Sequence, residues 1–329
     1  MKQSVDFKSL RERIRGPEFP VVIPFTEDQD VDLSSLYSYI DFLVSNKAPV
    51  ILLTVGTSRF NLLTSDEIKQ VNEVVVEAIR GRAISIVAGP GPTRGSTREN
   101  IQFAQHAVSI GADAILILYP ERWYGDEHVV QFFYDITQSV DIGIMIHALP
   151  MRDGFGGVTS LKYIKTDVIY RLIEQKNIIG IKEESGNRKI FEEILNKFHN
   201  TLPIIGAGGA MRRFLHDYTL GARSYLVGIG SFKPELAIKF YNAVISDNVT
   251  RAENIAEKYE DPYFDFAVSL GWHRALKETL YLLNIMPPFE RLPFNRINEI
   301  EREKLREVLI KCNWLKRGNE FVSNKNTNT

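Results

Sequence analysis

The chain has 329 residues, of which 44% are hydrophobic and 25% charged, a composition typical of a soluble globular protein with a sizeable core. Forty basic residues nearly balance forty-one acidic ones, so the net charge of -1 favours neither nucleic acid nor an anionic membrane as a partner. The amino terminus is charged and no run of about 18 apolar residues occurs, so we expect a cytoplasmic protein that does not enter membranes. Cys312 is the only cysteine, which excludes an internal disulfide and a zinc site of several thiolates.

Eight short apolar runs recur along the chain, and segments with helical periodicity separate them. Their nearly continuous apolarity is typical of strands that are covered on both faces. The segment 65–79 is one of the helical ones, with Thr64 as its capping residue, and the segment 97–111 is another, which ends at Gly111. Strand and helix alternating eight times predict an α/β fold, a (β/α)8 TIM barrel, with a doubly wound open sheet as the alternative. The predicted strands are 19–26, 48–56, 83–91, 113–120, 141–150, 178–186, 202–209 and 222–230.

From about Lys233 onward the alternation ends and only helical patterns follow, including 275–285 and 298–315. We therefore divide the chain into a barrel that carries the catalytic site and a C-terminal helical subdomain. A polar, aperiodic tail that we expect to be disordered follows the subdomain. The predicted boundaries are 1–248, 249–316 and 317–329.

Lys182 stands out because it ends a buried strand, on the same side as Gly180. Active sites of such barrels lie at the carboxyl ends of the strands. Lysine is rarely buried without a partner, and burial of a lysine can supply the neutral amine that attacks a carbonyl. The structural alternative is an ion pair with Glu183, Glu184 or a carboxylate on another strand.

The motif IGIKEESGN around Lys182 resembles the lysine motif of the dihydrodipicolinate synthase and N-acetylneuraminate lyase family. Further similar segments appear in the family's order: IPFTEDQDVDLSSL, VGTSRFNLLTSDE, HALPMRDG and ALKETLYLLNI. The resemblance covers almost the whole chain. It implies that Lys182 forms an imine with a 2-oxo acid such as pyruvate and that no cofactor takes part.

The resemblance also implies roles for residues around the lysine. Thr57 and Ser58 match a hydroxyl pair that binds the substrate carboxylate and relays protons, so Ser58 is a catalytic candidate as well as a binding one. Turn chemistry is the structural alternative for both. Gly206 to Gly209 lie where the family closes the pocket around the substrate, and we expect Gly208 to be substrate-binding. Ile229 is a further substrate-binding candidate.

His147 occupies the position at which the family carries its catalytic tyrosine. An imidazole can act as an acid or a base near neutral pH, but its shape and its ordinary pKa of roughly 6.5 differ from those of a phenol. The strand of His147 neighbours that of Lys182 and the ring would point from the same end of the barrel, so we expect His147 to be a catalytic residue. Its alternative is a structural or merely polar role.

Two arginines could contact an anionic substrate. Arg59 replaces a glycine of the family pattern and offers paired donors to a carboxylate or phosphate, or else it is a solvated loop charge. Arg152, two residues after Pro150, matches the arginine that contacts a second substrate carboxylate in the synthase branch. The loop after the fourth strand reads YPERWYGDEH, and its aromatic residues are candidates for packing or for a subunit interface.

These patterns predict a Schiff-base-dependent lyase, aldolase or synthase that acts on pyruvate or a related 2-oxo acid. Its partner is that small molecule, and the resemblance implies a homodimer or homotetramer. No residue cluster suggests a metal. The alternative function is a noncatalytic or regulatory binder of a 2-oxo acid that has lost turnover with the tyrosine. A barrel enzyme for a phosphorylated substrate, without an imine, is the third possibility.

Overall fold

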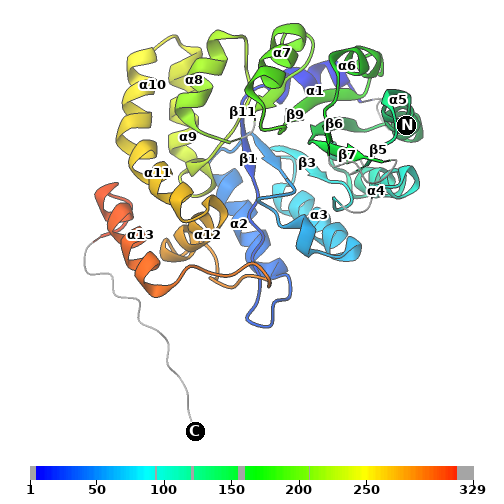
Figure 1. Cartoon of the computed structure of the whole chain (residues 1–329). Helices are drawn as coiled ribbons and strands as arrows, with labels where there is room; N and C mark the ends of the chain where they lie inside the picture. The colour runs from blue at the N-terminus through cyan, green and yellow to red at the C-terminus, as the bar shows by residue number, and fades with distance from the viewer. Residues whose placement is uncertain (1–4, 93–94, 120–121, 155–159, 207, 317–329) are drawn as a thin grey trace.

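Eight parallel strands form one sheet in this protein. A computed structural model describes residues 5–92, 95–119, 122–154, 160–206 and 208–316, so the predicted disordered tail lies outside the described residues. The strands are β1 (Pro17–Pro20), β2 (Val50–Leu52), β3 (Ile84–Ala88), β4 (Ala114–Leu118), β6 (Gly143–Ala148), β9 (Ile178–Glu183), β10 (Ile204–Gly206) and β11 (Tyr225–Leu226). Their order is β10-β9-β6-β4-β3-β2-β1-β11, and the two end strands contact each other. The sheet thus curls almost into a closed barrel, which confirms the predicted fold (Figure 1).

Helices connect the strands and surround the barrel (Figure 1). They are α1 (Phe7–Arg13), α2 (Leu33–Ser45), α3 (Ser65–Ile79), α4 (Thr97–Ile110), α5 (Asp126–Ser139), α6 (Thr166–Leu172), α7 (Arg188–Phe198), α8 (Met211–Thr219) and α9 (Pro234–Ile245). The predicted ends of two of them are confirmed. The Thr64 hydroxyl accepts from the Glu67 amide while the Glu67 carboxylate accepts from the Thr64 amide, which begins α3. Gly111 ends α4 at a φ of 81°.

Some local features differ from the predicted strands. The first strand lies earlier than 19–26, over Pro17–Pro20, and Pro24 lacks the amide hydrogen that a longer strand would need. The loops after β4 and β6 pair with each other in a small three-stranded sheet that the sequence did not suggest. Its strands have two or three residues each, too few for an alternating pattern to appear. They are β5 (Arg122–Trp123), β7 (Met151–Asp153) and β8 (Leu161–Lys162).

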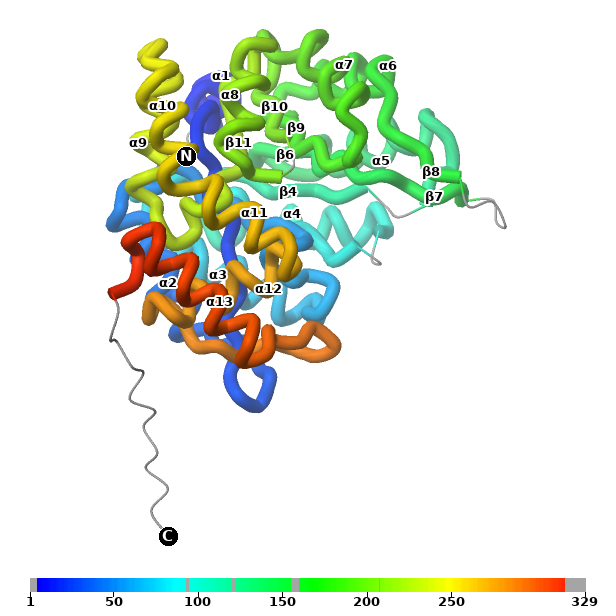
Figure 2. Tube along the Cα trace, turned by 60° about the vertical axis from the view of Figure 1, so that its left-hand side comes forward, coloured from blue at the N-terminus to red at the C-terminus, as the bar shows by residue number. Residues whose placement is uncertain are grey.

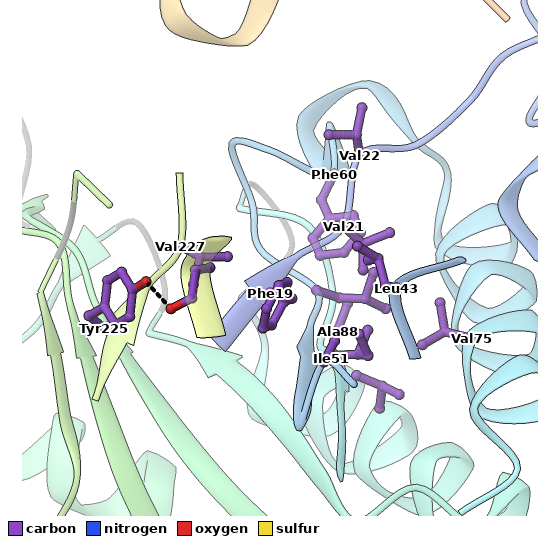
Figure 3. Packing of buried hydrophobic residues seen from close by; sticks show 14 of the residues in the cluster. Phe19, Val21, Val22, Leu43, Ile51, Phe60, Val75, Ala88, Tyr225 and Val227 are labelled. Carbon is purple, nitrogen blue, oxygen red and sulfur yellow. Dashed lines mark hydrogen bonds between the residues drawn. The ribbon is translucent and has the colours of Figure 1, made fainter. Parts of the chain in front are cut away.

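Two apolar clusters hold the barrel together. The larger one lies between the strands and the surrounding helices, where Phe19 and Ile51 pack with Leu43 and Val75 (Figure 3). The smaller one fills the inside of the barrel. Helix α1, near the amino terminus of the chain, contributes side chains to this cluster and so covers the interior of the barrel. The buried members of this inner cluster are Phe7, Leu10, Ile14, Val50, Leu52, Ile84, Ile86, Ala114, Leu116, Met145, Ile179 and Ile205.

After β11 the described chain is helical. The C-terminal helices α11 (Asp261–Ser269), α12 (Trp272–Leu282) and α13 (Glu299–Lys311) lie together on one side of the barrel (Figure 2). Polar bonds tie this region to the barrel loops: buried Lys277 donates to the Ile23 carbonyl at 3.0 Å, and Arg291 pairs with Glu67 at 2.7 Å. The additional elements are the 3-10 helices η1 (Phe60–Leu62) and η2 (Ile229–Ser231), α10 (Val249–Ile255), the π-helix η3 (Ala256–Glu260), α11 (Asp261–Ser269), α12 (Trp272–Leu282) and α13 (Glu299–Lys311).

Arg59 belongs to these ties, which corrects the alternative that it is a solvated loop charge. Its guanidinium is buried and donates to a Glu290 oxygen at 3.1 Å, and it lies 4.0 Å from the centre of the Phe294 ring. Burial lowers the pKa of Arg59, and the Glu290 carboxylate opposes that effect. Arg59 is therefore not a solvated loop charge, and its contact with an anionic substrate remains a prediction. Only the tertiary structure brings Glu290 to the loop after β2.

Replacement of Glu290 by leucine should leave a buried guanidinium without its counter-charge. We expect the free energy of unfolding to fall by about 3–5 kcal/mol, because an uncompensated buried charge is costly. Urea denaturation, monitored by circular dichroism, measures this change in the free energy of unfolding. Adding Arg59→Met should restore most of the loss. Asp141→Asn, which breaks an exposed ion pair with Lys176, is the control and should cost less than about 1 kcal/mol. A single Glu290→Leu variant as stable as the parent would contradict the expectation.

Candidate active site

Two neighbouring strands bring His147 and Lys182 together inside the barrel. In the parallel pairing of β6 with β9, His147 is the direct partner of Lys182. Side chains at paired positions of neighbouring strands point to the same face of a sheet. Gly180 precedes them on that face and leaves room for the Met145 side chain, since a Cβ there would meet it at 3.3 Å. Both His147 and Lys182 are enclosed, with 0% and 1% of their surfaces exposed.

Glu184, just after β9, completes what we call the lysine cluster: Lys182, His147 and Glu184. The Lys182 ammonium donates to Glu184 Oε2 in a short contact, and His147 Nε2 lies 2.6 Å from the same oxygen. Lys182 Nζ and His147 Nε2 are 3.1 Å apart. The ion pair that we gave as the structural alternative for the lysine is thus present, with Glu184 as its partner.

The protonation states of the cluster follow from its burial and its charges. Burial tends to raise the pKa of Glu184, but Lys182 and His147 outweigh it, so the pKa lies below its ordinary value and Glu184 is a carboxylate. Burial, helped by the Lys182 charge, lowers the pKa of His147 to about 4. The ring is therefore neutral near pH 7. Because a carboxylate only accepts, the ring proton belongs on Nε2, which donates to Glu184. Nδ1 then carries a buried lone pair that accepts no hydrogen bond from the described residues.

A second buried carboxyl group, Glu18, lies on the inner face of the barrel. It is paired in register with Val50 and Leu226, and it precedes Pro20 by two residues on the same face. It is 0% exposed, and neither carboxyl oxygen has a hydrogen-bond partner among the described residues. Burial raises the pKa of Glu18 well above its ordinary value although Lys182 acts against it. The sequence analysis missed this residue, whose signal was an acidic side chain inside an apolar strand.

A cavity of about 240 Å³ opens beside the lysine cluster. Glu184 lines it, whereas Lys182 and His147 lie behind Glu184 and do not. The Glu184 carboxylate thus connects the enclosed amine with the space that a small molecule can enter. The lining residues are Pro20, Thr54, Gly56, Thr57, Glu184, Gly208, Gly209, Leu226, Val227, Gly228, Ser231, Phe264, Val268, Trp272, His273 and Leu276.

Of the other predicted site residues, some line the cavity and others do not. Thr57 and Gly208 line the cavity. The Ser58 hydroxyl donates to the Val21 carbonyl at 2.7 Å and accepts from the Thr54 amide at 3.1 Å, so it braces the loop and does not line the cavity. Ile229 is buried behind lining residues, and exposed Arg152 lies on β7, outside the lining. The substrate roles assigned to these residues remain predictions.

Helices α11 and α12 supply a wall of the cavity that the sequence analysis did not foresee. Phe264 and Val268 come from α11, and Trp272, His273 and Leu276 come from α12. Burial, together with the nearby Arg59 charge, lowers the pKa of His273 to about 4, so this imidazole is also neutral near pH 7. In the sequence these residues look like the apolar face of ordinary helices.

In the parts of the chain that the structure describes, no group of three or more His, Cys, Asp or Glu side chains is arranged to hold a metal ion. None of the helices in those parts is long and apolar enough to cross a membrane.

Known proteins with similar sequences cover nearly the whole chain. The 4-hydroxy-tetrahydrodipicolinate synthase of Syntrophus aciditrophicus (strain SB) is 26% identical over 298 residues, which span 90% of this chain and 97% of that protein. The corresponding synthase of Methanothrix thermoacetophila is 28% identical over 304 residues, 90% of this chain and 97% of the relative.

Solved structures share the fold. The crystal structure of dihydrodipicolinate synthase from Aquifex aeolicus has a TM-score of 0.77 at 25% identity, covering 91% of this chain and 98% of that one. N-acetylneuraminate lyase from Mycoplasma synoviae has a TM-score of 0.75 at 23% identity, with 91% and 98% covered, and shows the fold alone. The model of the dihydrodipicolinate synthetase family matches residues 14–312. With the barrel and its enclosed lysine cluster in place, this match shows that the chain belongs to the dihydrodipicolinate synthetase family.

Proposed function

We propose that this protein is a lyase or synthase that forms an imine between Lys182 and pyruvate or a related 2-oxo acid. The observation that carries the proposal is the lysine cluster. An enclosed amine at the end of a barrel strand contacts a carboxylate, and that carboxylate lines a cavity large enough for a small molecule. The similar proteins described above are a 4-hydroxy-tetrahydrodipicolinate synthase and an N-acetylneuraminate lyase, which supports the same general kind of reaction here.

Glu184 is suited to carry protons during imine formation. In the first proposed step of the reaction, Glu184 accepts a proton from the Lys182 ammonium. The neutral amine then attacks the ketone carbon of the 2-oxo acid. A proton then moves from the nitrogen of the adduct to its oxygen, and Glu184 returns its own proton to the resulting hydroxyl, which leaves as water and yields the iminium. The iminium draws electrons from its neighbouring carbon, which can then lose a proton or exchange a carbon bond.

His147 has a related part in this proposal. Its neutral ring donates from Nε2 to Glu184, which holds the carboxylate between the amine and the cavity. This makes His147 a positioning residue for Glu184 and a nearby route for the proton, in place of the phenol that the family resemblance leads one to expect. The noncatalytic alternative has no observation in its favour, because the groups that imine chemistry requires are assembled around the lysine.

The carboxylate of the 2-oxo acid fits the loop after β2. Gly56 and Thr57 line the cavity near Glu184, with Gly208 and Gly209 as further lining residues. Hydroxyl and amide donors of such loops can bind a carboxylate without an opposing charge. We propose further that the reaction needs no cofactor, that the protein is cytoplasmic, and that it forms a homodimer or homotetramer.

Incubation with pyruvate and sodium borohydride should attach a reduced, pyruvate-sized adduct to the protein. Borohydride reduces an imine to a stable amine, so intact-protein mass spectrometry can detect it. Lys182→Ala should abolish the adduct, whereas Lys176→Ala, which removes an exposed lysine, should retain it. If pyruvate and longer 2-oxo acids all leave the parent unmodified, the proposed function is wrong.

Replacement of Glu184 by glutamine should slow adduct formation by about 100-fold, because the amide cannot accept the ammonium proton. The initial rate of borohydride trapping at saturating pyruvate measures the effect. Glu183→Gln is the matched control, since Glu183 accepts from the Ser185 amide and is the adjacent carboxylate. An unchanged rate in Glu184→Gln would remove Glu184 from the mechanism while leaving the imine in place.

The neutral state of buried His147 should make the protein less stable in mild acid. The folded-state pKa of about 4 lies below the ordinary value of 6.5, so the unfolded chain takes up a proton first as the pH falls. This contribution to stability is therefore present above pH 6.5 and is lost as the pH falls towards 4, by about 3 kcal/mol in all. His147→Gln should flatten the pH dependence of the free energy of unfolding across that window. His128→Gln, at an exposed ring, should leave the curve as it is in the parent.

A further inference from the structure

We infer that the part of the substrate beyond its 2-oxo acid unit is neutral and apolar, a statement that rests on the proposed function. The first observation is the far wall of the cavity. Phe264, Val268, Trp272 and Leu276 line it, all from helices α11 and α12. The rings of Phe264 and Trp272 lie 5.2 Å apart at an angle of 39°, so they present a broad hydrocarbon surface. Burial of an apolar group against such a surface is favourable, whereas a charged group there would lose its hydration.

The second observation concerns the positive charges near the cavity. No lysine or arginine is among its lining residues in the described parts of the chain. Arg59, the arginine closest in sequence to the lining loop, is bound to Glu290. Lys182 lies behind Glu184, and in the proposed imine its nitrogen is bonded to the ketone carbon of the substrate. A second carboxylate on the substrate would therefore find no cationic partner in this wall.

The third observation is the charge that the cavity does contain. Glu184 lines it as a carboxylate, and the imidazole of His273 is held neutral by burial and by the nearby Arg59. A negatively charged tail on the substrate would thus be repelled by the Glu184 carboxylate. The neutral imidazole of His273 would supply no positive charge to offset that repulsion. Repulsion and unpaired desolvation act in the same direction, so the cavity selects against anionic tails.

A pair of 2-oxo acids of nearly equal shape tests this selection. In 2-oxoglutarate the tail ends in a carboxylate, and in 5-methyl-2-oxohexanoate an isopropyl group replaces that carboxylate. We expect borohydride trapping on Lys182 to require at least about a tenfold lower concentration of 5-methyl-2-oxohexanoate for half-maximal adduct. Equal concentrations, or a preference for 2-oxoglutarate, would overturn the inference.

A substitution at the edge of the cavity tests the charge argument directly. Val268 lines the cavity and is 52% exposed, so a longer side chain there can be accommodated without disturbing the core. Val268→Arg should lower the half-saturating concentration of 2-oxoglutarate by about tenfold relative to Val268→Gln. Val268→Gln, of similar polarity without the charge, should keep the preference of the parent. If Val268→Arg traps 2-oxoglutarate no better than Val268→Gln does, a missing cation is not what excludes anionic tails.

The two proposals fail in different ways in these experiments. Absence of a pyruvate adduct in the parent would contradict the imine, and with it the proposed function. A pyruvate adduct combined with a preference for the anionic tail would preserve the imine and overturn only the inference about the tail. Loss of trapping in Lys182→Ala assigns the adduct to the lysine cluster in both cases.

Discussion

The structure around the site depends on one requirement: the positive charge of Lys182, which lies inside an apolar barrel, needs a counter-charge. Lys182 is almost completely enclosed, and a buried charge without a partner is strongly destabilising. Glu184 supplies the counter-charge, and His147 donates a hydrogen bond to the same carboxylate oxygen. The cluster therefore satisfies a stability requirement with the groups that proton transfer to and from an amine also needs. In the sequence analysis, an ion pair and a role in imine formation are alternatives for Lys182. The ion pair that the structure shows is compatible with the proposed reaction.

Two carboxyl groups near the same amine have opposite properties. Glu18 has no polar partner and its pKa is raised by burial, whereas contact with Lys182 and His147 lowers the pKa of Glu184. Only one of them therefore neutralises the lysine. Such divergence of neighbouring titratable groups is typical of sites at which protons move. The difference lies in position, since Glu184 follows its strand and reaches the cavity, while Glu18 lies within the barrel interior.

The barrel and the C-terminal helices contribute different parts of the site. Strands β6 and β9 position the lysine cluster, and helices α11 and α12 provide the apolar wall. The pair Arg59–Glu290 links the two parts, because it joins the loop after β2 to the segment that follows α12. Arg59 thereby holds the wall against the barrel.

The sequence by itself determined the barrel, because repeated apolar strands and periodic helices are local patterns, and it singled out Lys182 as a charge at the end of such a strand. The position of His147 beside it followed from strand order. Tertiary structure alone decided that Glu184 joins the cluster, that Ser58 braces its own loop and that Arg59 pairs with Glu290. It also decided that Trp272 and its neighbours face the cavity. These contacts depend on side-chain direction and on segments up to 231 residues apart, which no local pattern encodes.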